Sequence, residues 1–150
     1  MDMKIALACD HGGYALKEKI KTWLREAGHE VRDFGCNSTD SVDYSDYALP
    51  AAEAVAKAEV DRAVLICTTG IGVSISANKV KGVRCALCTD TMTARLTREH
   101  NDTNALALGA GVVGENLAKE ILFTWLSTPF SGVARHQRRI DKISAYESKT

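Results

Sequence analysis

The chain has 150 residues, the usual length of a single domain, since a chain of this size buries about 70% of its unfolded surface. Its 45% hydrophobic and 25% charged residues exclude disordered, collagen-like and coiled-coil proteins. The 19 basic and 19 acidic side chains cancel, so no overall charge attracts nucleic acid or an anionic membrane, and any anion site must be local.

Short apolar runs alternate with segments of helical period, which is typical of βαβ units around a parallel sheet. We therefore predict an α/β fold, a Rossmann-like three-layer α/β/α sandwich with a five-stranded parallel sheet, in one domain spanning residues 1–150. In chain order the pattern predicts strand 4–9, helix 14–27, strand 30–34, a polar loop at 40–47, helix 48–58, strand 62–67, helix 73–79, strand 83–88, helix 91–99, strand 104–108, helix 115–126 and helix 135–147.

The apolar runs are shorter than the ~20 residues that cross a bilayer, and the N-terminal segment lacks the basic start and cleavage site of a signal peptide. We therefore expect a cytoplasmic protein that binds neither membrane nor nucleic acid. The odd number of cysteines predicts free thiols in a reducing compartment rather than disulfides. Cys85 and Cys88 form one C-x-x-C pair, but no second Cys or His pair completes a zinc site, so we expect no metal.

Three polar clusters adjoin the predicted strands, at residues 9–13, 67–72 and 100–104. Ligands of open parallel sheets bind beyond the carboxyl ends of strands, where loops converge and helix N-termini offer N–H groups. The first two clusters follow strands directly. The third precedes a strand, so we expect its loop to carry it to the same edge.

Each cluster also has an ordinary structural interpretation. Asp10 could cap the first helix, and His11 could be a solvated loop residue. Cys67 could be a small core side chain, and His100 could bond only to a turn. The expected convergence of all three clusters on one sheet edge favours a functional site.

Several familiar sites are excluded by spacing. No cysteine has an arginine six residues later, which excludes a Cys-based phosphatase, and a nucleotide P-loop motif is absent. Gly109, Gly111 and Gly114 match G-x-G-x-x-G, but no acidic residue ends a strand about 20 positions later to hold a ribose hydroxyl. A dinucleotide site is therefore a weak hypothesis.

Four motifs together resemble one family. They are CDHGG at 9–13, CTTGIG at 67–72 followed by SISANK, REHNDTN at 98–104, and RHQRR at 135–139. In order and spacing they are similar to type B ribose-5-phosphate isomerase, within the family that also holds allose- and galactose-phosphate isomerases. The resemblance covers nearly the whole chain. It implies a Rossmann-like homodimer, sometimes a dimer of dimers, with active sites shared between subunits and neither metal nor organic cofactor.

The resemblance further implies interconversion of ribose 5-phosphate and ribulose 5-phosphate through an enediolate, a step of the pentose phosphate pathway. Cys67 would be the general base, Asp10 and His100 would move the ring-opening protons, and Thr69 with the N–H groups of the glycine loop would stabilise the enediolate oxygen. The substrate-binding residues carried over by position are His11, Tyr44, Thr68, Gly70, Ile71, Gly72, Asn101, Arg135 and Arg139. The helix at about 135–147 would pack on the partner subunit.

Elementary chemistry supports these roles. A thiol between a strand end and a helix N-terminus is placed where its thiolate is favoured. Glycines allow backbone N–H groups to approach an oxyanion closely. Arg135 and Arg139 lie four residues apart, so they share a helix face and can hold one phosphate.

The chain departs from the family pattern at several positions. Where some relatives carry a glutamate base the chain has Ile71, which leaves Cys67 as the candidate base. Thr68 stands where glycine is common, Gly111 stands where an arginine is common, and the approach to Arg135 is one residue longer than usual. These departures leave two alternatives open: an isomerase of allose 6-phosphate, galactose 6-phosphate or a free aldose, and a sugar-phosphate-binding protein without catalysis.

Overall fold

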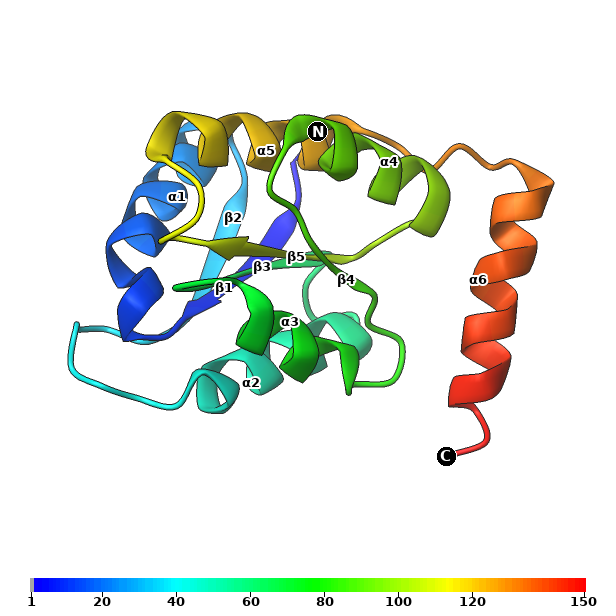
Figure 1. The fold of residues 1–150 in the computed structure, drawn as a ribbon, viewed down its shortest axis with the longest axis horizontal. Coiled ribbons are helices and arrows are strands. Elements are labelled where there is room, and N and C mark those ends of the chain that lie inside the picture. Colours follow the sequence, from blue (N-terminus) through cyan, green and yellow to red (C-terminus); the bar gives the residue numbers. More distant parts are fainter. Residues whose placement is uncertain (1) are drawn as a thin grey trace.

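A computed structural model describes residues 2–150 and has the predicted α/β architecture (Figure 1). Its sheet is parallel, with strand order β2-β1-β3-β5-β4. The strands are β1 (Lys4–Cys9), β2 (Glu30–Gly35), β3 (Arg62–Cys67), β4 (Cys85–Leu87) and β5 (Ala105–Gly109). The prediction of a five-stranded parallel sheet is confirmed.

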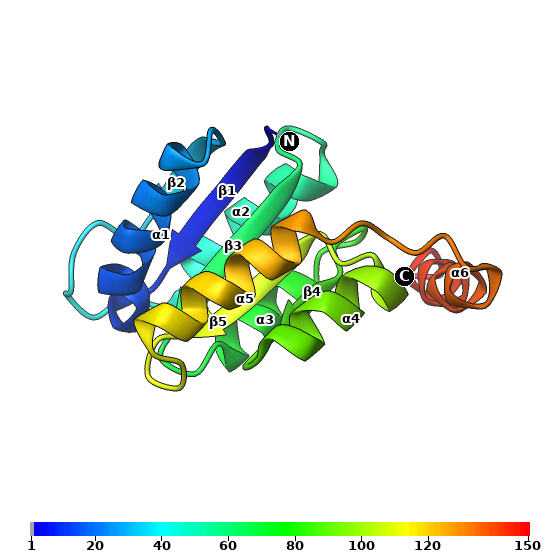
Figure 2. The ribbon, with the colours of Figure 1, turned by 90° about the horizontal axis from the view of Figure 1, so that it is seen from above.

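Helices cover both faces of the sheet (Figures 1 and 2). One layer holds α1 (Tyr14–Glu26), α4 (Thr91–Asn101) and α5 (Glu115–Ser127), and the other holds α2 (Tyr44–Ala56) and α3 (Ile71–Asn78). The last helix, α6 (Ala134–Glu147), extends from the body of the domain and packs chiefly against α4. Within residues 2–150, no helix is both long and apolar enough to cross a membrane.

The two faces of the sheet differ in side-chain size. On the α1/α5 face β1 presents Ile5 and Leu7, which pack with large side chains such as Trp125. On the α2/α3 face β1 presents Ala6 and Ala8, opposite the buried alanines of α2. Since small side chains on both elements allow close approach, α2 lies tightly on the ends of β1 and β3.

The boundary before α2 was predicted wrongly. The sequence pattern predicts a polar loop at 40–47 and a helix at 48–58, whereas α2 begins at Tyr44 and ends at Ala56. Its first turn is polar because Asp and Ser are favoured at helix N-termini, where they meet the unpaired N–H groups and the positive end of the helix dipole. Tyr47, which was assigned to the loop, packs against both core clusters.

Two other elements differ at their ends. The fourth strand is shorter than the predicted 83–88, because side-chain amides replace strand partners at its entrance: Asn104 Oδ1 accepts from Arg84 N–H at 2.8 Å, and Asn78 Oδ1 accepts from Cys85 N–H at 2.8 Å. Helix α3 begins two residues before the predicted start, at Ile71. The glycine loop therefore leads directly into the helix.

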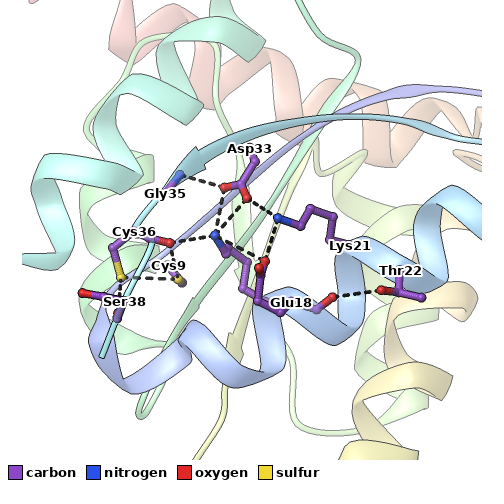
Figure 3. Close-up of polar contacts among 9 residues, drawn as sticks. Cys9, Glu18, Lys21, Thr22, Asp33, Gly35, Cys36 and Ser38 are labelled. Atoms are coloured by element: carbon purple, nitrogen blue, oxygen red, sulfur yellow. Dashed lines mark hydrogen bonds and ion pairs between the residues drawn. The ribbon is translucent and has the colours of Figure 1, made fainter. Parts of the chain in front are cut away.

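A buried ion pair joins α1 to β2 (Figure 3). Lys17 is fully buried, and its ammonium donates to both carboxylate oxygens of Asp33, at 3.0 and 2.9 Å, and to the Cys36 carbonyl at 2.7 Å. Burial by itself would raise the pKa of Asp33, but hydrogen bonds from Lys21 and Lys17 hold it below its usual value. The ionised carboxylate is thus part of the folded structure.

We expect Asp33→Asn to lower the free energy of unfolding by about 3 kcal/mol, because it removes the carboxylate that binds the buried Lys17 ammonium at both oxygens and leaves only Glu18 Oε2, 3.7 Å away, as its counter-ion. Urea denaturation at pH 7 measures this change. Lys19→Ala, which removes an exposed ion pair with Glu115, should cost less than about 1 kcal/mol. Because the Asp33 pKa is lowered on folding, the Asp33 carboxylate contributes fully to the free energy of unfolding above pH 3.8. This contribution is lost as the pH falls further. Equal effects of the two substitutions would contradict this account.

Candidate functional site

The loop that follows β3 places a thiol at the carboxyl edge of the sheet. Cys67, the last residue of β3, is 5% exposed and faces the α2/α3 layer. The backbone N–H of Gly70 donates to its sulfur at 3.1 Å. Such a donor stabilises negative charge on the sulfur when the thiol gives up its proton.

Glycines are required to hold this loop in place. Gly70 has a φ of 79°, and a Cβ there would lie 2.5 Å from the Leu87 side chain and 2.9 Å from the Leu108 backbone. At Gly109 a Cβ would lie 2.6 Å from the Thr69 backbone. Gly109, the first glycine of the G-x-G-x-x-G stretch, is thus explained by its packing against the Cys67 loop. Dinucleotide binding is not needed to explain it.

Asp10 and His11 lie on the neighbouring loop, after β1. Asp10 is buried, and its Oδ1 accepts from the N–H groups of Gly12 at 2.9 Å and Gly13 at 3.2 Å, so it caps the short 3₁₀ turn His11–Gly13. His11 Nδ1 accepts from Val42 N–H at 3.2 Å. Because Nδ1 is an acceptor, the imidazole proton is on Nε2, where it can be donated to a ligand.

The remaining predicted residues of this edge surround Cys67. Thr69 Oγ1 accepts from Ile71 N–H at 3.2 Å, and the Tyr44 ring packs on Gly72, where a Cβ would be 2.6 Å from the ring. The sequence predicts that the N–H groups of this loop stabilise an oxyanion. Two of them have other partners: the Gly70 N–H donates to the Cys67 sulfur, and the Ile71 N–H donates to Thr69 Oγ1. If this loop binds an oxyanion, as predicted, the donors would be the next amide, that of Gly72, and the Thr69 hydroxyl.

Thr68 fills the space between two glycines. A Cβ at Gly12 would lie 2.1 Å from Thr68 Oγ1, and one at Gly111 would lie 3.0 Å from Thr68 Cγ2. The Thr68 carbonyl also accepts from Gly111 N–H at 2.8 Å. The two unusual residues, Thr68 and Gly111, are thus in contact. The Thr68 side chain fits because residue 111 is a glycine and has no side chain.

The expectation that His100 and Asn101 share this edge is wrong within one chain. Helix α4 has 11 residues and runs antiparallel to the strands over about 16 Å. It ends at Asn101, just before β5 begins at Ala105, which pairs with Ala63 at the start of β3. His100 and Asn101 therefore lie at the amino edge of the sheet, because the loop before β5 is too short to return them.

The two predicted arginines lie at the same end as His100. Helix α6 packs on α4 there, on the side of the molecule away from the carboxyl ends of the strands (Figure 2). Arg135 and Arg139 are exposed, and between them the buried His136 stacks on His100 with ring centroids 4.2 Å apart. Burial lowers the pKa of His136 below its usual 6.5, and the charges of His100, Arg135 and Arg139 lower it further. His136 was missed as a site residue although it lies inside the RHQRR motif.

The predicted site residues thus form two groups. The carboxyl-edge group contains Asp10, His11, Tyr44, Cys67, Thr68, Thr69, Gly70, Ile71 and Gly72, and the amino-edge group contains His100, Asn101, Arg135 and Arg139. A cavity of about 360 Å³ runs along α4 and is lined by Leu87, Thr93, His100 and Asn101 among others. Within residues 2–150, no three His, Cys, Asp or Glu side chains gather as a metal ion would require.

These features define a class of protein. A parallel α/β sheet carries a thiol against a glycine loop and a helix N-terminus, while a separate surface carries a histidine and two arginines suited to an anion. This is the arrangement of a small-molecule enzyme of the α/β class that handles a phosphorylated substrate.

Comparison with known proteins gives the family. Residues 5–143 match the model of the Ribose/Galactose Isomerase family. The chain is 49% identical to ribose-5-phosphate isomerase B of Escherichia coli (strain K12), over 97% of each chain. The structure is similar to that of Clostridium thermocellum ribose-5-phosphate isomerase B (TM-score 0.96, 52% identity, 98% of this chain and 99% of that chain). It is also similar to the Mycoplasma genitalium enzyme with bound ribulose-5-phosphate (TM-score 0.93, 42% identity, 98% and 97%). The chain belongs to the Ribose/Galactose Isomerase family.

The stacked histidines give a test of the amino-edge group. We expect His100→Asn to raise the pKa of His136, because it removes a neighbouring group that becomes positively charged. An NMR titration of the His136 ring measures the change, and Lys142→Ala, on the same helix, should leave that pKa unchanged. Because the pKa is lowered on folding, packing of α6 on α4 should weaken as the pH falls below 6.5. A His136 pKa that does not respond to His100→Asn would contradict the stacking.

Proposed function

We propose that the chain is a cytoplasmic homodimer that interconverts D-ribose 5-phosphate and D-ribulose 5-phosphate, with each active site built from the carboxyl-edge group of one subunit and the amino-edge group of its partner. The observation that carries the two-chain site is the separation of these groups in a single chain by the length of α4. The family and the names of its relatives support the reaction.

Ring opening needs one group that removes a proton from the anomeric hydroxyl and one that returns a proton to the ring oxygen. Asp10 on one subunit and the partner's His100 supply this pair in the proposed site. The open-chain aldose then presents C2 to Cys67. Its bonds to Gly12 and Gly13 orient the Asp10 carboxylate before substrate binds.

In the proton-transfer step, the Cys67 thiolate removes the proton from C2, and an enediolate forms as the C1 carbonyl becomes an oxyanion. The Thr69 hydroxyl and the N–H of Gly72 stabilise that oxygen. The thiol then returns its proton to C1, while the proton of the C2 hydroxyl passes to the C1 oxygen, so that C2 becomes the ketone and C1 the primary alcohol. No electron acceptor is needed, since C1 is reduced as C2 is oxidised within one molecule.

The phosphate is held from both subunits. His11 donates through Nε2, the position left free by its bond to Val42, and the partner's Arg135 and Arg139 approach from α6. Two guanidinium groups on one helix face form paired hydrogen bonds to phosphate oxygens. The Tyr44 ring, on Gly72, lines the sugar beside them.

Exposed apolar side chains support a dimer. At the carboxyl edge Ile71, Ile75 and Met92 are each more than half exposed, and on α6 Ile143 and Tyr146 are 55% and 71% exposed. A two-fold axis brings the same two surfaces together twice. The apolar side chains of both edges are then buried where the two groups of site residues meet.

The reaction is tested directly by ketose formation. We expect the purified protein to convert ribose 5-phosphate, with a higher kcat/KM than for allose 6-phosphate, galactose 6-phosphate or free ribose. A higher kcat/KM on a six-carbon phosphate would assign the activity to that sugar. The unusual residues Thr68 and Gly111 would then explain the change of substrate. Binding without turnover of any of these sugars would contradict an enzyme function.

We expect Cys67→Ala to abolish turnover without unfolding the protein, because it removes the proposed base and opens only a small cavity. Cys67→Ser should lose at least about 100-fold in kcat, since a hydroxyl ionises far less readily than a thiol. Circular dichroism and ribose 5-phosphate binding serve as controls for folding. Turnover near that of the unmodified protein in either folded variant would remove Cys67 from the proton-transfer step.

The shared site is tested by co-refolding inactive variants. Mixing Cys67→Ala with Arg135→Ala/Arg139→Ala, or with His100→Asn, should restore roughly a quarter of full activity, because half of randomly paired dimers are mixed and each has one complete site. Mixing His100→Asn with the double-arginine variant should restore nothing, since both defects lie in the same group.

This last mixture is the matched control. If His100 acted beside Cys67 of its own chain, the pattern would reverse: the His100→Asn and arginine mixture would recover, and the His100→Asn and Cys67→Ala mixture would not. Mass spectrometry of the refolded dimers confirms that mixed dimers are present.

A further inference from the structure

Two thiols lie side by side beneath the carboxyl-edge group. Cys9 ends β1 and Cys36 follows β2, and the two are 0% and 2% exposed. Their sulfurs are 3.8 Å apart (Figure 3). The Cys36 N–H donates to the Cys9 carbonyl at 2.9 Å. Neither sulfur has a role in the proposed isomerisation.

The geometry suits a disulfide. The hydrogen bond from Cys36 N–H to the Cys9 carbonyl and the 3.8 Å separation of the sulfurs hold the two cysteines side by side, as a disulfide with α-carbons about 4.4–6.8 Å apart requires. Both side chains already point toward each other. The sulfurs therefore reach bonding distance, about 2.05 Å, mainly by side-chain rotation.

We propose that Cys9 and Cys36 form a reversible redox site that a hydroperoxide oxidises to a disulfide, and that this oxidation lowers the activity of the neighbouring isomerase site. The effect on activity rests on the proposed function, whereas the disulfide itself does not.

The chemistry proceeds in two balanced steps. The Cys36 thiolate attacks one peroxide oxygen, the O–O bond breaks, and a sulfenic acid forms as hydroxide takes up a proton and leaves as water. The Cys9 sulfur then attacks the Cys36 sulfur, the S–O bond breaks, and a second water leaves with the Cys9 proton. Two thiols are thus oxidised by two electrons, and hydrogen peroxide is reduced to two waters.

The surroundings assign different roles to the two thiols. Burial and, after it, the neighbouring Cys36 raise the pKa of Cys9 to about 12, so Cys9 keeps its proton and acts second. The Lys17 ammonium, which donates to the Cys36 carbonyl at 2.7 Å, opposes this rise. Cys36 begins a segment whose residues 37–41 are exposed, and its thiol donates to the Ser38 carbonyl at 3.3 Å. Because Cys36 is itself only 2% exposed, the proposed attack requires this exposed segment to move aside.

The pair is connected to the site on both sides. Cys9 directly precedes Asp10, and Cys36 begins the segment that holds His11 through Val42 N–H and ends at Tyr44. Oxidation removes the thiol proton that bonds to the Ser38 carbonyl and ties Cys36 to Cys9. We expect this to displace the segment between Cys36 and Tyr44, and with it His11, from the position that substrate needs.

The test is peroxide treatment of the native protein, followed by thiol blocking and tryptic mapping without reduction. Cleavage after Lys4, Lys17, Arg32 and Lys57 releases residues 5–17, with Cys9 as their one cysteine, and residues 33–57, with Cys36 as theirs. We expect these two peptides to be linked, 2 Da lighter than their sum. Activity should fall at least two-fold in step with the linked fraction and return with dithiothreitol.

Two variants separate this effect from oxidation of Cys67. Cys36→Ser keeps a hydroxyl for the Ser38 carbonyl but cannot form the disulfide, so the reversible loss should disappear, apart from any that follows oxidation of the Cys67 peptide. Cys88→Ser, which removes a buried thiol outside the pair, should behave as the unmodified protein does.

Absence of the linked peptide under conditions that oxidise Cys67 would overturn the redox site. Full linkage with unchanged activity would overturn its effect on the isomerase site. If the protein converts none of the sugars tested, the linked peptide still decides the redox site, so this failure is distinct from failure of the proposed function.

Discussion

The hydrogen bond from Gly70 N–H to the Cys67 sulfur is the interaction on which the carboxyl-edge group depends. It exists because the chain turns back immediately after β3, with Gly70 in a left-handed conformation against Leu108 and Leu87. The turn fits only because Gly109, on the adjacent strand, leaves room for the Thr69 backbone. Helix α3 then begins at Ile71, so its N-terminal amides face the same space as the sulfur. A donor fixed before substrate arrives needs no reorganisation during proton transfer.

A second constraint follows from the topology. Each helix between parallel strands must return the chain to the amino edge, and α4 does so with His100 in its last turn. His100 and the two arginines of α6 are therefore separated from the thiol, Asp10 and His11 in every copy of the chain. In the proposed dimer, two copies related by a two-fold axis supply both groups to each site, so that activity would depend on association.

Much of this arrangement could be predicted from the sequence. The continuous apolar runs of β1 and β3 and the glycine-rich stretches after them predicted the sheet and the Cys67 loop correctly, because local hydrophobic pattern and turn chemistry decide those features. The position of His100 could not be found in the same way. It depends on where α4 ends relative to the sheet, and its neighbour His136 is 36 residues away in the chain. The start of α2 at Tyr44 was missed because polar residues are common both in loops and in first helical turns.

The central claim, a site completed by two subunits around Cys67, is tested most directly by a crystal structure with ribulose 5-phosphate bound. The account predicts one sugar phosphate per Cys67, with C1 and C2 beside the sulfur and the phosphate between His11 and the partner's Arg135 and Arg139. A sugar phosphate that contacts residues of one subunit alone, or that lies away from the Cys67 sulfur, would contradict it.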